Sequence, residues 1–239
     1  MEVLTRKQRE IQEREQQILS LARPILVAEG YQALNMERLA AQMEYAKGTL
    51  YNHFPNKEEI VAALAIESME LRRRMFEAAA TEVQGSRLRM TAIGCACDMY
   101  ASVCSEHFAV EQMLRNATIW EKSSEKRQGI IRQCELRCMS VVAGVVRDAL
   151  ASGDLELPVE LGPEEFVFGF WALTYGSHAL ISSSPSLPDI GVSDPVRSMR
   201  YHAWTLMNGY SWKPLINFAE TEAIMNELAH GELSNVAKS

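Results

Sequence analysis

The chain has 239 residues, of which 47% are hydrophobic and 23% are charged, and this composition excludes a disordered protein. The net charge of −7 lies entirely in residues 75–239, because residues 1–74 contain eleven basic and eleven acidic side chains. An electroneutral first part joined to an acidic body is consistent with a small nucleic-acid-binding domain carried by a larger one, although many two-domain enzymes have the same asymmetry.

Cysteine usage and hydropathy argue against a secreted or membrane-embedded chain. The five cysteines, at positions 95, 97, 104, 134 and 138, are odd in number and lie in helical patterns, and no signal peptide precedes them. One uncharged stretch, residues 166–181, contains Thr174, Ser177 and His178 and is shorter than the ~20 apolar residues that a membrane span needs. We therefore expect a cytoplasmic protein without a membrane segment.

Helical periodicity recurs almost throughout the chain, and no strand-like alternation lasts more than a few residues, so the sequence predicts an all-α fold. Thr5 and Gln8 resemble a capping box, Asn35 can cap a second helix, and Pro55 cannot continue a third. The apolar spacing predicts four helices in the first part of the chain, at about residues 5–29, 36–43, 47–53 and 57–82.

The remaining chain is predicted to form longer helices. Apolar spacing places them at about residues 86–104, 108–116, 123–152, 163–182, 195–209 and 217–230. Residues 105–107 are expected to break the helical pattern, and residues 182–195 form a Ser/Pro-rich loop. The predicted architecture is an N-terminal three-helix domain, residues 1–56, and a C-terminal helical bundle, residues 57–239, connected by the helix 57–82.

The two short helices, 36–43 and 47–53, have the spacing of a helix-turn-helix. The second helix must anchor on its own core through Leu50 and Phe54, while its lysine, hydroxyl and amide groups face phosphate oxygens and base edges. The alternative is a structural turn between two bundle helices. The candidate DNA contacts are Asn35, Lys47, Gly48, Thr49, Tyr51, Asn52 and His53, with Lys57 at the start of the next helix as a further phosphate contact.

Residues 47–58, Lys-Gly-Thr-Leu-Tyr-Asn-His-Phe-Pro-Asn-Lys-Glu, closely resemble the signature of the tetracycline-repressor (TetR) family. The C-terminal bundle resembles that family only in length, all-α character and position. Asn35 stands where the family usually has Thr, and it could still cap a helix and reach a phosphate. Glu44-Tyr45-Ala46 replaces the usual Gly-Val-Ser in the turn, so we expect a positive φ at Glu44 and no side-chain cap on the recognition helix.

The resemblance implies a homodimeric repressor that binds a near-palindromic double-stranded DNA operator and is released by a small-molecule effector. One face of the uncharged helix could meet a partner subunit through Phe166, Gly169, Phe170, Ala172, Leu173 and Gly176. A cavity for a lipophilic effector could be lined by Met99, Tyr100, Val103, Phe108, Met113, Trp120, Trp171, Tyr175 and His178. These residues could equally form the core of a single chain, and the regulator could work without an effector.

Other kinds of chemistry find little support in the sequence. Cys134 and Cys138, at i and i+4, could meet a metal or form a redox pair, but no His lies at a useful spacing, and we interpret both as small buried hydrophobes. The sequence has no nucleophile elbow, phosphate-binding Gly loop, His-Glu-x-x-His motif or paired-carboxylate arrangement. We therefore predict that the chain is not an enzyme and has no metal or cofactor site.

Overall fold

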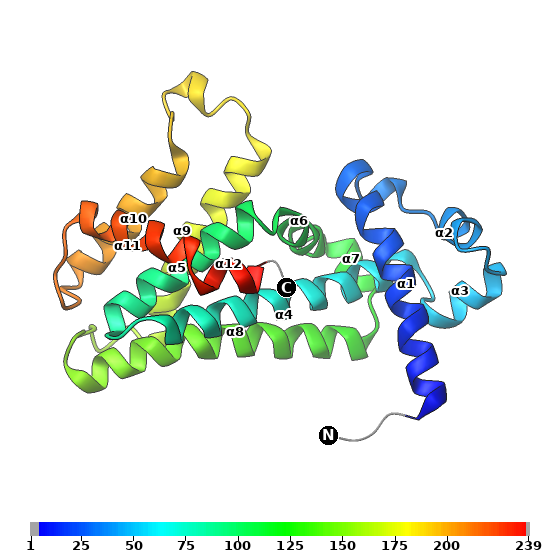
Figure 1. The fold of residues 1–239 in the computed structure, drawn as a ribbon, viewed down its shortest axis with the longest axis horizontal. Helices are drawn as coiled ribbons and strands as arrows, with labels where there is room; N and C mark the ends of the chain where they lie inside the picture. The colour runs from blue at the N-terminus through cyan, green and yellow to red at the C-terminus, as the bar shows by residue number, and fades with distance from the viewer. Residues whose placement is uncertain (1–4, 238–239) are drawn as a thin grey trace. The chain divides into compact units, whose positions relative to one another are not determined.

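The structure, a computed structural model, describes residues 5–237, and these residues form helices and loops with no strand, which confirms the predicted all-α fold (Figure 1). None of these helices combines the length and the hydropathy that crossing a membrane requires. The α-helices are α1 (Arg6–Glu29), α2 (Met36–Gln42), α3 (Lys47–His53), α4 (Lys57–Glu82), α5 (Ser86–Ser102), α6 (Ser105–Leu114), α7 (Ala117–Lys122), α8 (Glu125–Ser152), α9 (Pro163–Ser183), α10 (Pro195–Gly209), α11 (Phe218–His230) and α12 (Glu232–Ala237). Two short 3-10 helices are η1 (Tyr31–Ala33) and η2 (Pro188–Ile190).

The chain divides into two compact units. The first unit contains the residues up to 69 and residues 106–133, and the second contains residues 70–105 and 134–239. Helices α4 and α8 each contribute to both units. The predicted head, residues 1–56, lies within the first unit, which also holds α7, most of α6 and the first turns of α4 and α8. The first unit is therefore larger than the head, and a separate domain ending at residue 56 stays a prediction.

Helix α1 organises the core of the first unit. It begins at the predicted capping box, where the backbone N–H of Thr5 donates to Gln8 Oε1 over 2.8 Å and the backbone N–H of Gln8 donates to Thr5 Oγ1 over 3.3 Å. It ends at Gly30, whose φ of 82° is one that side chains with a Cβ rarely adopt. Its second half packs against α2, which in turn packs against α3. The buried face of this half consists of Ile18, Leu19, Ala22, Ile25 and Leu26.

The predicted boundaries around α6 were wrong. Helix α5 ends at Ser102 and α6 begins at Ser105, so residues 105–107 form the first turn of a helix rather than a break. An acidic residue such as Glu106 is favourable in a first turn because the free N–H groups there carry partial positive charge. Helices α7 and α12 were not predicted, since helices of one or two turns carry little periodicity.

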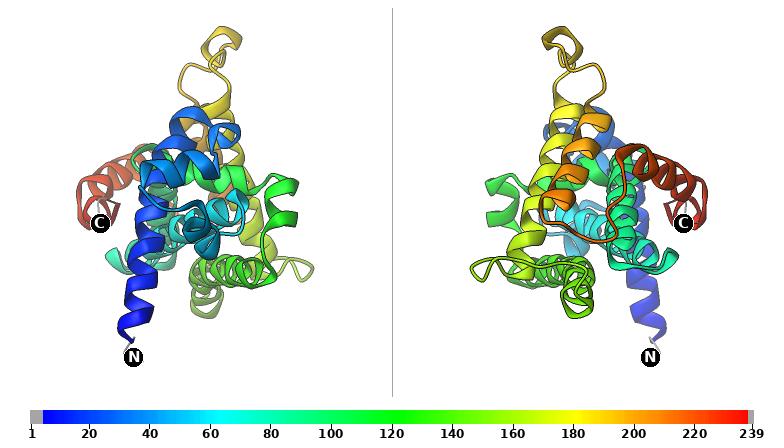
Figure 2. Two further views of the ribbon diagram at one scale, coloured as in Figure 1. Left: turned by 90° about the vertical axis from the view of Figure 1, so that its right-hand side faces the viewer. Right: turned by 90° about the vertical axis from the view of Figure 1, so that its left-hand side faces the viewer.

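Helix α5 is the element that the other helices of the second unit share. Helices α9, α10, α11 and α12 all contact it, and α9 also packs against α10 (Figure 2). The loop after α10 is held by Trp212, which has no exposed surface and donates from Nε1 to Ser86 Oγ over 3.0 Å. Arg87, also fully buried, donates to the backbone oxygen of Trp212 and to Asn208 Oδ1, and burial lowers the pKa of its guanidinium. These bonds fasten the end of α10 to the start of α5.

Candidate nucleic-acid interface

The helix-turn-helix consists of α2, a short turn and α3. The side-chain oxygen of Asn35 accepts hydrogen bonds from the backbone N–H groups of Glu37 (2.8 Å) and Arg38 (3.2 Å), so Asn35 caps α2 as predicted. In the turn, Glu44 has a φ of 56°, which confirms the predicted positive φ. Ala46 precedes α3 without any side-chain capping bond, also as predicted. The departures from the family signature therefore leave the local architecture intact, at the cost of backbone strain and one missing cap.

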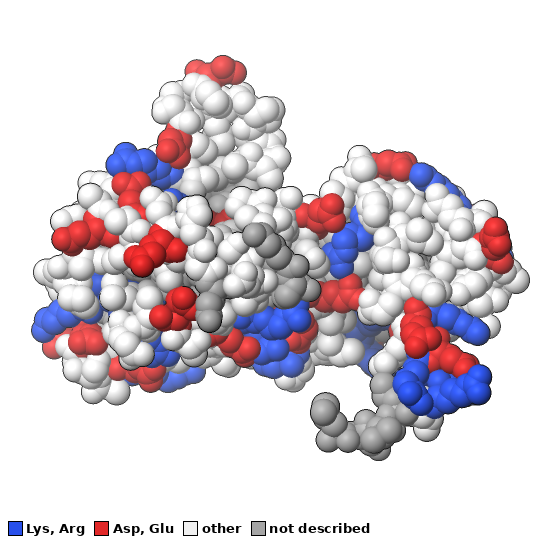
Figure 3. All heavy atoms as spheres, viewed as in Figure 1, with Lys and Arg blue, Asp and Glu red and all other residues white. Residues whose placement is uncertain are grey.

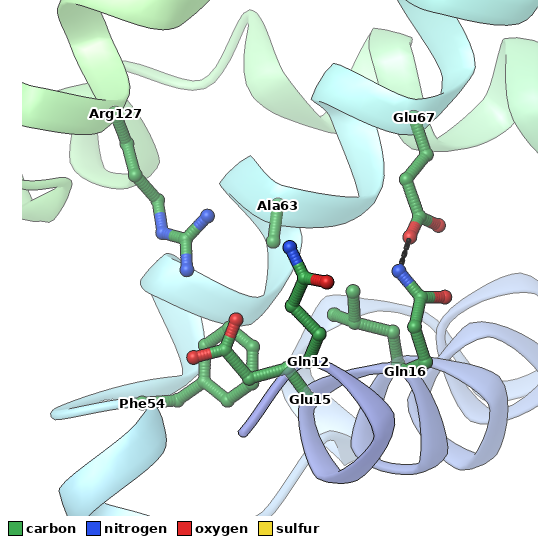
Figure 4. Close-up of a pocket in the computed structure, with 8 residues that line it drawn as sticks. Gln12, Glu15, Gln16, Phe54, Ala63, Glu67 and Arg127 are labelled. Atoms are coloured by element: carbon green, nitrogen blue, oxygen red, sulfur yellow. Dashed lines mark hydrogen bonds between the residues drawn. The ribbon is translucent and has the colours of Figure 1, made fainter. Parts of the chain in front are cut away.

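One side of α3 is anchored in the core. Leu50 and Phe54 have no exposed surface, as predicted. The ring of Phe54 also faces Arg127 of α8, whose guanidinium carbon lies 5.2 Å from the ring centroid (Figure 4). The Nε of Arg127 donates to Glu59 Oε2 over 2.6 Å. A pocket beside this contact is lined by Gln12, Glu15, Gln16, Leu19, Phe54, Ala63, Glu67 and Arg127. The position of α3 thus depends on core burial and on a contact from α8.

The opposite side of α3 presents polar groups to solvent. Gly48, Tyr51 and Asn52 are exposed, Thr49 is half-buried, and the side chain of Lys47 is 58% exposed. Lys47 Nζ lies 2.5 Å from Glu37 Oε1 on α2, and this hydrogen bond raises the pKa of Lys47 and lowers that of Glu37. Because an exposed ion pair contributes little stability, Lys47 can exchange Glu37 for another anion at low cost.

His53 and Lys57 do not face solvent as the sequence suggested. The side chain of His53 is only 10% exposed, and its Nδ1 lies 3.7 Å from Glu15 Oε1 on α1. Lys57 Nζ donates to the backbone oxygen of Tyr31 over 3.1 Å and lies 4.0 Å from the centroid of the Tyr31 ring. Both side chains would have to leave these partners to reach DNA. Sequence patterns could not predict these contacts, because Glu15 and Tyr31 belong to elements distant along the chain.

The residues that follow α3 are held by the α7–α8 corner (residues 122–127). Glu59 accepts from the backbone N–H of Ser124 and from Arg127, and Lys122 Nζ lies 3.3 Å from Glu58 Oε1. Both carboxylates are buried, whereas the sequence indicated only an acidic first turn.

Tyr31 also binds Glu58, because its hydroxyl donates a hydrogen bond to Glu58 Oε1 over 2.7 Å. Burial and the neighbouring carboxylate raise the pKa of Tyr31 to about 12. Burial alone would raise the pKa of Glu58, but hydrogen bonds from Tyr31, the backbone and Lys122 together lower it. Glu58 therefore stays ionised at neutral pH although it is buried.

The candidate effector-binding residues are divided between the two units. Met99, Tyr100 and His178 are buried and Trp171 and Tyr175 are half-buried in the second unit, whereas Phe108, Met113 and Trp120 belong to the first. Val103 differs from the buried members of this set, since it lies after the end of α5 and is 56% exposed.

Two polar residues beside His178 were missed in the sequence. The Nε2 of His178 lies 2.9 Å from Asp98 Oδ1, and Arg200 Nε donates to Asp98 Oδ2 over 2.6 Å. Asp98, His178 and Arg200 come from α5, α9 and α10, so no sequence spacing could join them. They form a polar cluster within an otherwise apolar unit.

The predicted partner-facing side of α9 is largely open in the single chain. Gly169 and Ala172 are exposed, and Phe170, Leu173 and Gly176 are half-buried. Phe166 departs from this pattern: it is buried, with its ring centroid 5.0 Å from that of Tyr210 and 5.8 Å from that of Trp212. Phe166 therefore belongs to the core of its own chain, because the loop after α10 folds back over it.

The cysteine pair behaves as small core residues. Cys134 and Cys138 are both buried, as predicted. The Sγ of Cys134 lies 3.3 Å from Glu70 Oε1, and burial raises the pKa of this thiol. Among residues 5–237, no group of three or more His, Cys, Asp or Glu side chains is arranged to hold a metal ion.

Comparisons with known proteins agree with this architecture. Residues 18–64 match the family model of bacterial regulatory proteins of the tetR family. The fatty acid metabolism regulator protein of Bacillus subtilis (strain 168) is 22% identical over 191 residues, which cover 74% of this chain and 93% of the relative.

Solved structures share the fold at low sequence identity. A bacterial regulatory protein of the tetR family from Rhodococcus RHA1 superposes with a TM-score of 0.63 at 18% identity, covering 83% of this chain and 97% of that one. AibR in complex with isovaleryl coenzyme A and operator DNA superposes with a TM-score of 0.53 at 20% identity, and the match covers 70% of this chain and 86% of that one.

The strained turn yields a stability prediction. Glu44→Gly is expected to raise the free energy of unfolding by about 0.5–1 kcal/mol, because glycine adopts a positive φ without a Cβ clash. Glu44→Gln keeps the Cβ and removes only the charge, so it should change stability by less than about 0.5 kcal/mol. Urea unfolding at one fixed protein concentration measures both. Equal stability of the two variants would show that the backbone at Glu44 is not strained.

Proposed function

Because the chain is a transcriptional regulator of the TetR family, we propose that it is a homodimeric repressor that binds a near-palindromic operator and leaves it when a small lipophilic effector binds. The observation that carries the DNA-binding part is the two-sided character of α3: Leu50 and Phe54 are fully buried, while Lys47, Tyr51 and Asn52 are exposed. A helix anchored in this way can enter a major groove without disturbing the core behind it.

In this proposal the exposed residues have different tasks. Lys47 contacts a phosphate, and its present partner Glu37 is surface-exposed and easily exchanged. Tyr51 and Asn52 reach base edges, since an amide can bond both edge atoms of an adenine. Thr49, half-buried beside them, contributes a hydroxyl to a phosphate or a base. The DNA-binding set supported best is therefore Lys47, Gly48, Thr49, Tyr51 and Asn52, with Asn35 as the cap of α2.

A binding assay with the upstream region of the chain's own gene tests this part. Lys47→Gln should weaken operator binding about tenfold and lower the salt-dependence slope by about two for a dimer, because each subunit loses one phosphate contact. Arg74→Gln, which removes an exposed charge from the second-unit part of α4, is the matched control and should bind like the wild type. Glu44→Gly should tighten binding, since it removes a negative charge and eases the turn. Equal binding by Lys47→Gln and Arg74→Gln would contradict the role of α3.

The homodimer is supported by the outer face of α9. Phe168 and Leu180 are 59% and 58% exposed, and Gly169 and Ala172 between them let a partner backbone approach closely. Exposed apolar side chains grouped on one helix usually mark an interface. A dimer is also what a palindromic site requires, because two recognition helices must meet half-sites about 34 Å apart.

A charge placed on this face tests the dimer. Ala172→Glu should lower the dimerisation affinity at least tenfold, because a carboxylate would be buried without a partner. Ala219→Glu, at an exposed position in the first turn of α11, is the control and should leave the assembly unchanged. Light scattering after size-exclusion chromatography over a range of concentrations gives the molar mass. If Ala172→Glu and Ala219→Glu have the same molar mass at every concentration, the dimer interface does not include this face of α9.

The effector proposal rests on the interior of the second unit. Buried Met99 and Tyr100 and half-buried Trp171 and Tyr175 offer apolar and aromatic surface, and His178 with Asp98 offers a polar end. Such a lining suits a lipophilic molecule with one polar group. The Bacillus subtilis relative is a fatty acid metabolism regulator, and AibR was solved with isovaleryl coenzyme A. Fatty acids and their coenzyme A thioesters are therefore the first compounds to test.

A thermal-shift screen with these compounds tests the effector. A ligand at one hundred times its Kd stabilises a folded protein by about 2.7 kcal/mol, so Tm should rise by several degrees, and the same ligand should weaken operator binding. Tyr175→Ala should reduce the Tm shift, whereas Tyr201→Ala, at an exposed position on α10, should not. If no compound raises Tm or releases DNA, the effector-independent regulator becomes the better description.

A further inference from the structure

The first turns of α1, residues 6–14, bury no side chain, although Gln12 lines the pocket beside Phe54 and Arg127. Residues 6–14 are all exposed, Glu15 is half-buried, and the first buried side chains are Ile18 and Leu19. In Figures 1 and 2 this end of α1 extends beyond the other helices of its unit. We call residues 6–14 the arm. The tetR family match begins only at residue 18, so the arm lies outside the part of α1 that the family model covers.

The arm is helical although none of its side chains is buried. The Thr5–Gln8 capping box and the exposed ion pair between Arg6 and Glu10, at 2.8 Å, are its local stabilising contacts. Such contacts contribute a few tenths of a kcal/mol to about 1 kcal/mol each, and a helix that is polar on all sides is marginal in water. A surface of this kind gains stability when a partner binds it.

The charges of the arm indicate what that partner is. Four of its nine residues, Arg6, Lys7, Arg9 and Arg14, are basic, and Figure 3 shows blue and red atoms gathered at this end of α1. Among residues 5–237, Lys7 and Arg14 have no ion-pair partner. The arm has one large apolar side chain, Ile11, so it lacks the apolar face that a membrane-bound helix needs. An anionic polymer, DNA, fits this composition.

The arm is continuous with the helix-turn-helix. Lys7 and Arg14 lie seven residues apart, which places them on one stripe of α1 about 10 Å apart along its axis. Gln17, one turn beyond Arg14, accepts a hydrogen bond from the Tyr45 hydroxyl over 3.1 Å. Tyr45 belongs to the turn before α3. The stripe that carries Lys7 and Arg14 therefore leads directly to the candidate DNA-binding surface.

We propose that the arm is a second DNA-contacting element, in which Lys7 and Arg14 bind phosphates flanking the half-site that α3 occupies. This rests on the proposed DNA binding by α3. The arm extends about 13 Å beyond Glu15, close to the ~12 Å width of a major groove. The phosphates that it contacts are therefore about one groove width away from those beside α3. These contacts carry no base information, and they add affinity and salt dependence.

The test compares charge-matched double variants of the full chain on two DNA lengths. The wild type first selects a duplex from a random pool. Two forms of this duplex are then compared: a flanked duplex, which keeps the DNA on both sides of the protected core, and a trimmed duplex, which contains the protected core alone. Lys7→Gln/Arg14→Gln should weaken binding to the flanked duplex about 10- to 100-fold and lower the salt-dependence slope by about three to four, for four lost contacts per dimer. On the trimmed duplex it should bind like the wild type. The charge-preserving Lys7→Arg/Arg14→Lys should retain both affinity and slope.

The control is Arg74→Gln/Lys213→Gln, which removes the same charge from exposed positions on α4 and in the loop after α10. It should match the wild type on both duplexes. If the arm variant and this control bind the flanked duplex equally, the arm proposal is overturned while DNA binding by α3 stands. If the wild type selects no duplex at all, the proposed function fails and the arm proposal fails with it.

Discussion

The burial of Leu50 and Phe54 is the constraint on which the rest of the DNA-binding surface depends. Helix α3 has seven residues, far fewer than an isolated helix needs, so its position comes from tertiary contacts. Both anchors are completely buried, and this leaves the other side of α3 free to present Lys47, Tyr51 and Asn52. Phe54 has a second task, because its ring also contacts the Arg127 guanidinium of α8. The anchor of the recognition helix is thus shared with a helix that continues into the second unit.

In the proposed function, this shared anchor is the physical link through which an effector would act on α3. The α7–α8 corner holds Glu58 and Glu59, which follow α3 and are both buried, so breaking either contact would leave a buried carboxyl group without its partner. A change of position of the corner must therefore move these residues with it. Helices α4 and α8, which meet at Glu59 and Arg127, also supply residues to the second unit, where the proposed effector lining lies.

Local signals in the sequence predicted the local structure well. The bounds of α3, the Asn35 cap, the positive φ of Glu44 and the missing cap at Ala46 were all predicted, because each depends on neighbours within a few residues. The structure differs from the sequence-based expectations where a partner comes from another element. The His53 ring lies beside Glu15, and Lys57 donates a hydrogen bond to the backbone oxygen of Tyr31. Phe166 is covered by the loop after α10. The cluster of Asp98, His178 and Arg200 could not be predicted for the same reason, because its three residues come from three different helices.

The distribution of charge explains how an electroneutral head can bind a polyanion. Residues 1–74 hold equal numbers of acidic and basic side chains, but Glu58 and Glu59 are buried and do not face a ligand. Other acids are occupied locally: Glu29 accepts two hydrogen bonds of 2.8 Å from Arg38, and Glu67 accepts from Arg23. The basic side chains without such a partner among residues 5–237 include Lys7 and Arg14 on the arm. The surface that DNA meets is therefore more positive than the net charge of residues 1–74 suggests, because buried Glu58 and Glu59 pair with Lys122 and Arg127, which lie outside that count.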